Sequence, residues 1–136
     1  MISLINCVTG LVEFRQEIRH DDMKFTLKEA KEFSREGLKG YAYNSSGDFS
    51  NASAAYVEVT GRHGKVKTTT SDRVYYVLDG NGEFTVGDEN REVHKTDVVI
   101  IPKNTPYDFK VTDGSVLKMF LVHTPAFDPD TDVKLD

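Results

Sequence analysis

Hydrophobic and polar residues alternate with a period of two along much of the chain between residues 54 and 123. In the segment YDFKV, Tyr107, Phe109 and Val111 share one face, and the charged residues between them share the other. This alternation is typical of a β-strand with one buried face. Three further segments are apolar on both faces with few interruptions, which indicates strands covered on both sides: RVYYVL, DVVII and VLKMFLV.

Turn sequences separate these strands. The sequence DGNG at residues 79–82 supplies glycines where positive φ values are needed, so it predicts a hairpin between RVYYVL and EFTV. The sequence PKNTP at residues 102–106 predicts a bend, because proline has no amide hydrogen to donate within a sheet. Short strands with regular turns predict an antiparallel β-sandwich or a closed barrel.

The first third of the chain has a different pattern. The sequence FTLKEAKEF contains a capping box, in which Thr26 can accept a hydrogen bond from the amide of Glu29 while the Glu29 side chain reaches back. Together with Gly37 as a stop signal, it predicts one short helix over residues 27–36. Before it, alternating apolar residues over 12–18 predict an early strand.

Length and composition place these elements in one domain. The chain has 136 residues and a net charge of −5, which favours a single domain without a nucleic-acid-binding surface. Cys7 is the only cysteine, so we expect no internal disulfide. We find neither an apolar run long enough to span a membrane nor a signal peptide, and we expect a cytoplasmic protein that binds no membrane.

We divide the chain into three parts. Residues 1–40 form an N-terminal extension of strand and helix, residues 41–126 form a barrel, and residues 127–136 form an acidic tail. The tail has no apolar periodicity, so we expect it to be poorly anchored.

The barrel segment resembles the cupins, a family of small β-barrels with a jelly-roll fold. The first cupin motif has a glycine, two histidines, a glutamate and a final glycine at fixed spacing. Without a gap, Gly61 and Gly80 match the glycines, Lys67 and Thr69 take the histidine positions, and Arg73 takes the glutamate position. The resemblance implies an all-β, antiparallel jelly-roll barrel, here with one short N-terminal helix.

The second cupin motif is matched in part. Thr96 takes the place of its first glycine, Pro102 matches its proline, and Asn104 takes the place of its second glycine. Tyr107 replaces the histidine of this motif, and Val111 replaces the asparagine. The resemblance therefore covers the scaffold and not the metal ligands.

The substituted ligand positions argue against a metal. The ammonium group of Lys67 has no lone pair, and the guanidinium group of Arg73 stays protonated in proteins, so both would repel a divalent ion. No two histidines are spaced closely enough to form a ligand pair; they are His20, His63, His94 and His123. We predict no metal and no cofactor.

The resemblance implies that the former ligand positions point into the barrel. The predicted ligand-binding residues are Lys67, Thr69, Arg73, Tyr75 and Tyr107. Buried cations need partners, and these could be an anionic ligand, a carboxylate of the protein or water. Tyr107 and His123 are the candidates for proton transfer, whereas His63 is assigned to a loop.

Three functions remain open at this point. The first is a metal-free cupin that binds a small anionic or sugar-like molecule in the barrel. The second is a metal-independent isomerase or epimerase of sugars or nucleotide sugars that uses tyrosine and histidine, as some cupins do. The third is a non-catalytic scaffold that acts through its surface.

Assembly is predicted from the same strands. Strands that are apolar on both faces need cover on their outer side, which the early strand over residues 12–18 could supply by pairing with a second chain, as in many cupins. We expect a homodimer whose further partner is a small-molecule ligand.

Overall fold

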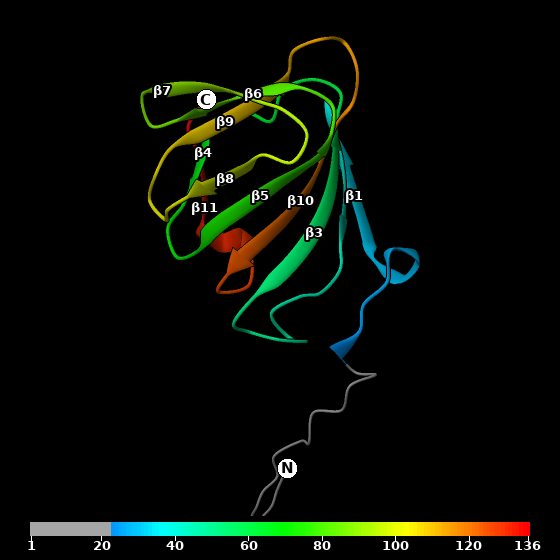
Figure 1. The fold of residues 1–136 in the computed structure, drawn as a ribbon. Coiled ribbons are helices and arrows are strands. Elements are labelled where there is room, and N and C mark those ends of the chain that lie inside the picture. The colour runs from blue at the N-terminus through cyan, green and yellow to red at the C-terminus, as the bar shows by residue number, and fades with distance from the viewer. Residues whose placement is uncertain (1–22) are drawn as a thin grey trace, which may run out of the picture.

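The computed structural model describes residues 23–136, which form two antiparallel sheets that face each other (Figure 1). The six-stranded sheet has the order β1 (Lys31–Arg35), β2 (Leu38–Ala42), β3 (Ser53–Val59), β10 (Leu117–Thr124), β5 (Asp72–Asp79) and β8 (Val98–Ile101). The five-stranded sheet has the order β11 (Asp132–Lys134), β4 (Val66–Thr68), β9 (Tyr107–Val111), β6 (Gly82–Val86) and β7 (Glu89–Val93). Two 3-10 helices complete the described residues: η3 (Leu27–Glu29) and η4 (Pro129–Thr131). The predicted all-β jelly-roll architecture is confirmed. No helix within residues 23–136 is long and apolar enough to cross a membrane.

The core lies between the two sheets, and the period-two pattern determines which residues enter it. Along β3, β5 and β10, every second residue is buried. The largest fully buried side chains include Tyr75, Phe84, Leu117 and Met119. Each such side chain contributes about 1.5–3 kcal/mol by leaving water, so the paired inner faces stabilise the barrel.

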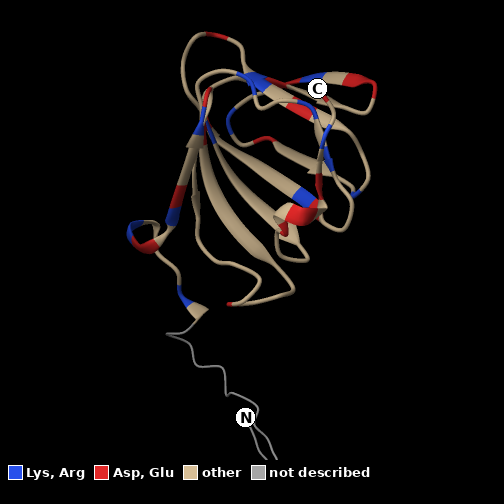
Figure 2. Ribbon diagram, turned by 180° about the vertical axis from the view of Figure 1, so that it is seen from behind, with Lys and Arg blue, Asp and Glu red and all other residues tan. Residues whose placement is uncertain are grey.

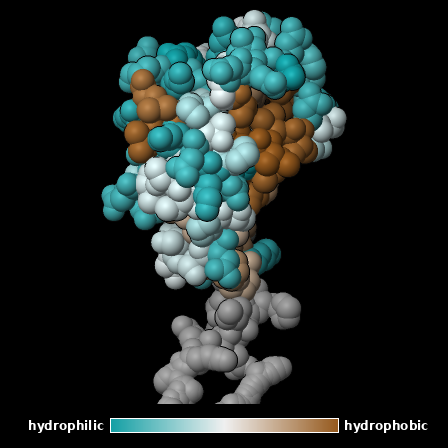
Figure 3. Space-filling view, turned by 90° about the vertical axis from the view of Figure 1, so that its left-hand side faces the viewer, coloured by the Kyte–Doolittle hydropathy of each residue, from teal (hydrophilic) through white to brown (hydrophobic). Residues whose placement is uncertain are grey.

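The outer face of the six-stranded sheet is also apolar. Edge strand β8 exposes 55% of Val98 and 64% of Ile100, and neighbouring strands expose Tyr76, Leu78 and Phe120. Figure 3 shows a broad hydrophobic area on one side of the molecule. By contrast, charged residues gather near the C-terminus and around the five-stranded sheet, and the long central strands carry few (Figure 2).

The predicted hairpin between RVYYVL and EFTV is wrong. These segments become β5 and β6, which lie in different sheets. Gly80 has a φ of +87°, and a Cβ atom there would lie 2.3 Å from the carbonyl oxygen of Val116. The glycine turn thus carries the chain from one sheet to the other beside a closely packed backbone. The hairpin forms one step later, where β6 pairs with β7.

The predicted helix over residues 27–36 is also wrong. The N-cap forms, since the amide of Glu29 donates to Thr26 Oγ1 at 3.3 Å. The Glu29 carboxylate accepts from the Thr26 hydroxyl and not from its amide, and the helix ends after the three residues of η3. Residues 31–35 continue as β1, which turns at Glu36 and Gly37 and pairs with β2. Every residue of β1 is exposed, so there is no buried stripe to favour a helix. A two-residue turn with Gly37 at a φ of +85° favours a hairpin instead.

Two positions that align with motif glycines have the positive φ that favours glycine. Thr96 has a φ of 76° and Asn104 a φ of 65°, and the sequence comparison places both where the second cupin motif has glycine. Asparagine tolerates this left-handed region, but a β-branched threonine rarely adopts it. The matching geometry supports the residue-by-residue assignment of the second motif.

The C-terminal residues are anchored, contrary to the expected loose tail. β11 pairs with β4 over three residues, and the amide of Leu135 donates to the carbonyl of Lys65 at 2.9 Å. The carboxylate of Asp136 pairs with the guanidinium of Arg62. An edge strand therefore holds this segment, which composition alone did not show.

The predictions for the N-terminal 40 residues can be compared with the structure only in part. The predicted strand over residues 12–18 and Cys7 lie outside the described residues. The boundary placed at residue 40 falls inside β2, which continues the six-stranded sheet next to β3.

Candidate functional site

Five aromatic rings form a cluster inside the barrel at the five-stranded sheet. Tyr75 on β5 meets Phe84 on β6 at 5.2 Å and Phe109 on β9 at 5.3 Å between ring centroids. The ring of His63 stacks on Tyr107 at 5.5 Å and lies 4.5 Å from Phe109. Tyr75 and Tyr107 are each 1% exposed, so two hydroxyl groups and one imidazole share a largely dry environment.

His63 is held in this cluster by its backbone. Its amide donates to the carbonyl of Phe109 at 2.8 Å, and Arg62 forms a bridge with Lys110. Ring atom Nδ1 lies 2.8 Å from the carbonyl of Gly64. A carbonyl can only accept, so Nδ1 carries the proton and Nε2 keeps its lone pair. Burial lowers the pKa of His63 to about 4, and the ring is therefore neutral at physiological pH.

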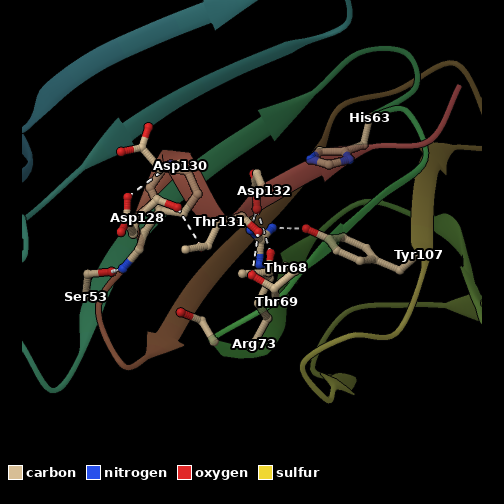
Figure 4. A network of polar contacts seen from close by, with 12 residues as sticks. Ser53, His63, Thr68, Thr69, Arg73, Tyr107, Asp128, Asp130, Thr131 and Asp132 are labelled. Atoms are coloured by element: carbon tan, nitrogen blue, oxygen red, sulfur yellow. Dashed lines mark hydrogen bonds and ion pairs between the residues drawn. The ribbon is translucent and has the colours of Figure 1, made fainter.

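A polar chain runs from the tyrosines to the C-terminal strand. The hydroxyl groups of Tyr75 and Tyr107 lie 3.3 Å apart, and the Nη1 atom of Arg73 donates to the Tyr107 hydroxyl (Figure 4). Burial raises the pKa of Tyr75 to about 12, so this hydroxyl stays protonated at neutral pH. The positive charge of Arg73 beside Tyr107 would stabilise a phenolate there.

Arg73 is buried and has a carboxylate partner. Its Nη2 atom lies 2.7 Å from Oδ1 of Asp132, and the hydroxyl of Thr68 donates to the same oxygen at 2.6 Å. The guanidinium also lies over the rings of Tyr107 at 5.2 Å and Phe127 at 5.7 Å. The sequence left three possible partners for Arg73: an anionic ligand, a carboxylate of the protein, or water. The structure shows a carboxylate of the protein, that of Asp132.

An open cleft lies beside β9, on the outer side of the five-stranded sheet, where Thr85 and Asp108 pair. It has a volume of about 220 Å³, and Tyr107 lines it together with Arg62, Lys65 and Asp108. A larger cleft of about 470 Å³ lies among the turns around Gly80 and is lined by exposed polar side chains. We place the candidate site at the aromatic cluster inside the barrel, because it brings two tyrosine hydroxyl groups and an imidazole together.

Lys67 does not share the inward face with Arg73. Val66 and Thr68 are buried on β4, whereas Lys67 between them is only partly buried. Val66 is paired with Tyr107 on β9, so positions 66 and 68 face the barrel, one residue away from the gapless motif assignment. Thr69 lies just past β4, where its hydroxyl donates to the carbonyl of Thr131 at 3.3 Å.

His123 lies near Arg73 and away from the His63 ring. It is the register partner of Arg73 on the neighbouring strand, and its ring packs 5.0 Å from Phe127. Burial, with a smaller contribution from the positive charge of Arg73, lowers the pKa of His123 to about 3. Among the described residues its Nε2 atom has no hydrogen-bond partner.

Sequence reasoning missed two residues of this site. His63 was assigned to a loop because nothing in GRHGK signals that the segment pairs with β9. Asp132 was placed in a loose tail because the tail reads as acidic and non-periodic. Both residues enter the site through pairing between segments far apart in the chain.

The described residues offer no obvious metal site. No group of three or more His, Cys, Asp or Glu side chains within residues 23–136 is placed to hold a metal ion. Arg73 places a positive charge among the inward side chains beside Tyr107. The donor set around Tyr107 therefore does not fit a divalent metal.

Comparison with known proteins identifies similar chains. The cupin domain family matches residues 57–123. An uncharacterized protein of Methanocaldococcus jannaschii is 34% identical over 68 residues, which are 49% of this chain and 54% of that protein. The chain thus spans about half the length of this curated relative.

Solved structures extend the comparison. Pac13, a nucleoside dehydratase of Streptomyces, is 25% identical with a TM-score of 0.73, covering 82% of this chain and 89% of that chain. Variants of that enzyme that replace a histidine by glutamine, or one of two tyrosines by phenylalanine, have been solved with uridine. Oxalate decarboxylase of Bacillus subtilis is 14% identical with a TM-score of 0.72, covering 82% of this chain and 32% of that chain, which shows a shared fold.

Proposed function

The chain belongs to the cupin superfamily, and from this premise we propose that it is a metal-free cupin that binds a small anionic or sugar-like molecule in its barrel. The molecule would lie inside the barrel against the aromatic cluster. Aromatic faces suit a flat base or a sugar ring, and the few polar groups among them orient it.

One observation carries the proposal further: a neutral histidine and two tyrosines meet at one place. The ring of His63 stacks on Tyr107, and the hydroxyls of Tyr107 and Tyr75 lie 3.3 Å apart. A histidine and two tyrosines are also the residues replaced in the uridine-bound variants of the nucleoside dehydratase. This agreement favours a lyase that removes water from a nucleoside-type molecule.

The geometry supports a general acid–base mechanism. His63 Nε2 would take a proton from a carbon of the sugar, and Tyr107 would give its proton to the departing hydroxyl, so that a carbon–carbon double bond and water form. Arg73 donates to the Tyr107 hydroxyl and would stabilise the phenolate left behind. Solvent then takes the proton from His63 and returns one to Tyr107, which restores both groups.

A metal-independent sugar isomerase or epimerase is the second candidate. The same pair, His63 and Tyr107, could remove and return a proton without loss of water. Mass spectrometry of the products separates the two reactions, because isomerisation leaves the mass unchanged whereas dehydration removes one water. A chain that binds no small molecule would instead fit the non-catalytic scaffold.

Two adjacent tyrosines test binding in the barrel. Tyr75 is 1% exposed and Tyr76 on the opposite face of β5 is 37% exposed. We expect Tyr75→Phe to weaken uridine binding about 3- to 10-fold, because one buried hydroxyl loses its contacts. Calorimetric titration measures this, and Tyr76→Phe should bind like the unaltered protein. Equal weakening in both variants, or no uridine binding at all, would contradict the proposal.

We also propose that two chains associate through the outer face of the six-stranded sheet. This face carries the exposed side chains of Val98 and Ile100 beside Leu78 and Phe120, and a second copy would cover them. Single chains rarely leave a large contiguous apolar area in water.

Light scattering tests the association. We expect a dimer at micromolar concentration and a monomer for Ile100→Lys, because the substitution would place a charge in the buried centre of the interface. The matched control is Lys95→Glu, on the exposed turn before β8, which should remain dimeric. A monomeric unaltered protein would rule out this interface.

A further inference from the structure

We infer that Arg73 is the binding site for a phosphate group on the ligand, and that the carboxylate of Asp132 occupies this site until the ligand displaces it. The inference rests on the proposed function, since it concerns the same barrel, and it names the ligand class. The C-terminal segment, residues 129–136, then acts as a displaceable cover over the site.

The surroundings of Arg73 are those of an anion site. Its side chain is 4% exposed, which would be strongly unfavourable for an unpaired charge. Two aromatic rings, those of Tyr107 and Phe127, hold the guanidinium within 5.2 and 5.7 Å. One anion must therefore stay beside this group in either state.

Asp132 accepts from only one of the two donors on one edge of the Arg73 guanidinium. The Nε and Nη2 atoms form one edge of the guanidinium and can grip two oxygens of one anion. Asp132 takes Nη2 at 2.7 Å, whereas Nε is buried and has no hydrogen-bond partner among residues 23–136. The hydroxyl of Thr68 supplies a third donor at the same carboxylate oxygen.

Three donors around one point suit phosphate better than a single carboxylate oxygen. A phosphate presents several acceptor oxygens in a tetrahedral arrangement, so that Nε, Nη2 and the hydroxyl of Thr68 could each receive one. This would satisfy the donor that Asp132 leaves unpaired. The additional hydrogen bond to Nε favours binding of phosphate over binding of the Asp132 carboxylate.

The segment that carries Asp132 is an edge strand, so its displacement would leave the six-stranded sheet intact. Its ladder with β4 spans three residues, Asp132 to Lys134, at the edge of the five-stranded sheet. The side chain of Asp132 is 28% exposed against 4% for Arg73. Short edge strands with solvent-exposed hydrogen bonds open at lower free energy than central strands. The contacts of Leu135 with Lys65 and of Asp136 with Arg62 would have to open with this ladder.

The position links the phosphate to the proposed chemistry. Arg73 donates to Asp132 through one nitrogen and to the Tyr107 hydroxyl through another (Figure 4). A phosphate that replaces Asp132 would thus place the rest of the ligand beside Tyr107 and His63. The geometry fits a phosphorylated sugar or a nucleotide in which phosphate and sugar are neighbours.

Inorganic phosphate tests the exchange directly. In the unaltered protein, the competing carboxylate reduces the apparent affinity for phosphate. We expect Asp132→Asn to bind phosphate about tenfold more tightly, as measured by the rise in melting temperature with phosphate concentration. Asp130→Asn lies on the same segment, and its carboxylate is exposed, so this control should behave like the unaltered protein. Equal affinities in all three proteins, or equal tightening in both variants, would overturn the inference.

Hydrogen exchange on the unaltered protein gives a second test that does not depend on a variant. We expect uridine 5′-monophosphate to increase exchange of the amides in residues 132–135 and uridine to leave it unchanged. If both ligands bind but neither alters this exchange, the inference fails while the proposed function stands. If neither binds, the proposed function fails as well, and phosphate binding by Asp132→Asn alone would still establish the anion site.

Discussion

The His63→Gln variant should lose about 100- to 10,000-fold in kcat for water elimination while it still binds uridine. His63 is the proposed base, and a positioned base contributes an acceleration of this size. Glutamine can still donate to the carbonyl of Gly64, which lies 2.8 Å from the ring, so the segment should keep its path beside β9. The loss should therefore fall on kcat and leave KM nearly unchanged.

The exposed His94 provides the matched control. Its ring contacts Asn81, outside the aromatic cluster, and His94→Gln should retain full activity. Initial rates from mass spectrometry of the dehydrated product, measured over a range of substrate concentrations, give kcat and KM for each variant. Full activity of His63→Gln would remove His63 from the mechanism and transfer the role of the base to another group.

Strand positions could be predicted from the sequence because a half-buried strand alternates apolar residues on its buried face with polar residues on its exposed face. The segment YDFKV alternates strictly and forms β9 over the same five residues, and SAAYVEV forms β3. This alternation is visible within the segment itself, whichever strand pairs with it. This is why the strands were predicted better than their connections.

Pairing between strands could not be predicted in the same way. The turn at Gly80 has the composition of a hairpin, yet β5 and β6 separate into two sheets. A local sequence specifies the turn, whereas the choice of sheet depends on β10 and β9, which follow much later in the chain. The predicted helix failed for a related reason, since pairing of β1 with β2 outweighed an N-cap at Thr26.

The candidate site shows the same division. Arg73, Tyr75 and Tyr107 were predicted to face the barrel, and they do so because their strands alternate. His63 and Asp132 were missed because each depends on a distant partner, β9 for His63 and β4 for Asp132. The motif assignment placed Lys67 inward, but the register of β4 turns it to the other face.

Acid should destabilise the protein steeply between pH 6.5 and about 4. Burial lowers the pKa of His63 from 6.5 to about 4 and that of His123 to about 3. Within this window both rings bind a proton in the unfolded chain and stay neutral in the folded one. The free energy of unfolding should therefore fall by about 2.7 kcal/mol per pH unit as the pH decreases, about half of it from each ring.

The sign follows from the neutral state of the buried rings. Stability is complete well above pH 6.5, where neither state is protonated, and is lost as the pH falls through 6.5, because only the unfolded chain gains protons. Over the whole window the loss is about 6 kcal/mol, which is comparable with the total stability of many domains. The carboxylate of Asp113 does not account for it, since hydrogen bonds from Ser115 and Asn81 lower its pKa to about 2 and place its effect below this range.

Urea unfolding at a series of pH values measures the change in the free energy of unfolding with pH. The variant His123→Gln separates the contribution of His123 from that of His63. His123 lies beside Arg73 and outside the His63 cluster, so its replacement should remove one of the two protons and halve the slope without altering the ring of His63. A buried glutamine lowers stability at pH 7, but it does not titrate, so the slope separates protonation from packing. An unchanged slope in His123→Gln would mean that its imidazole reaches water in the folded protein, and the buried, neutral state assigned to it would be wrong.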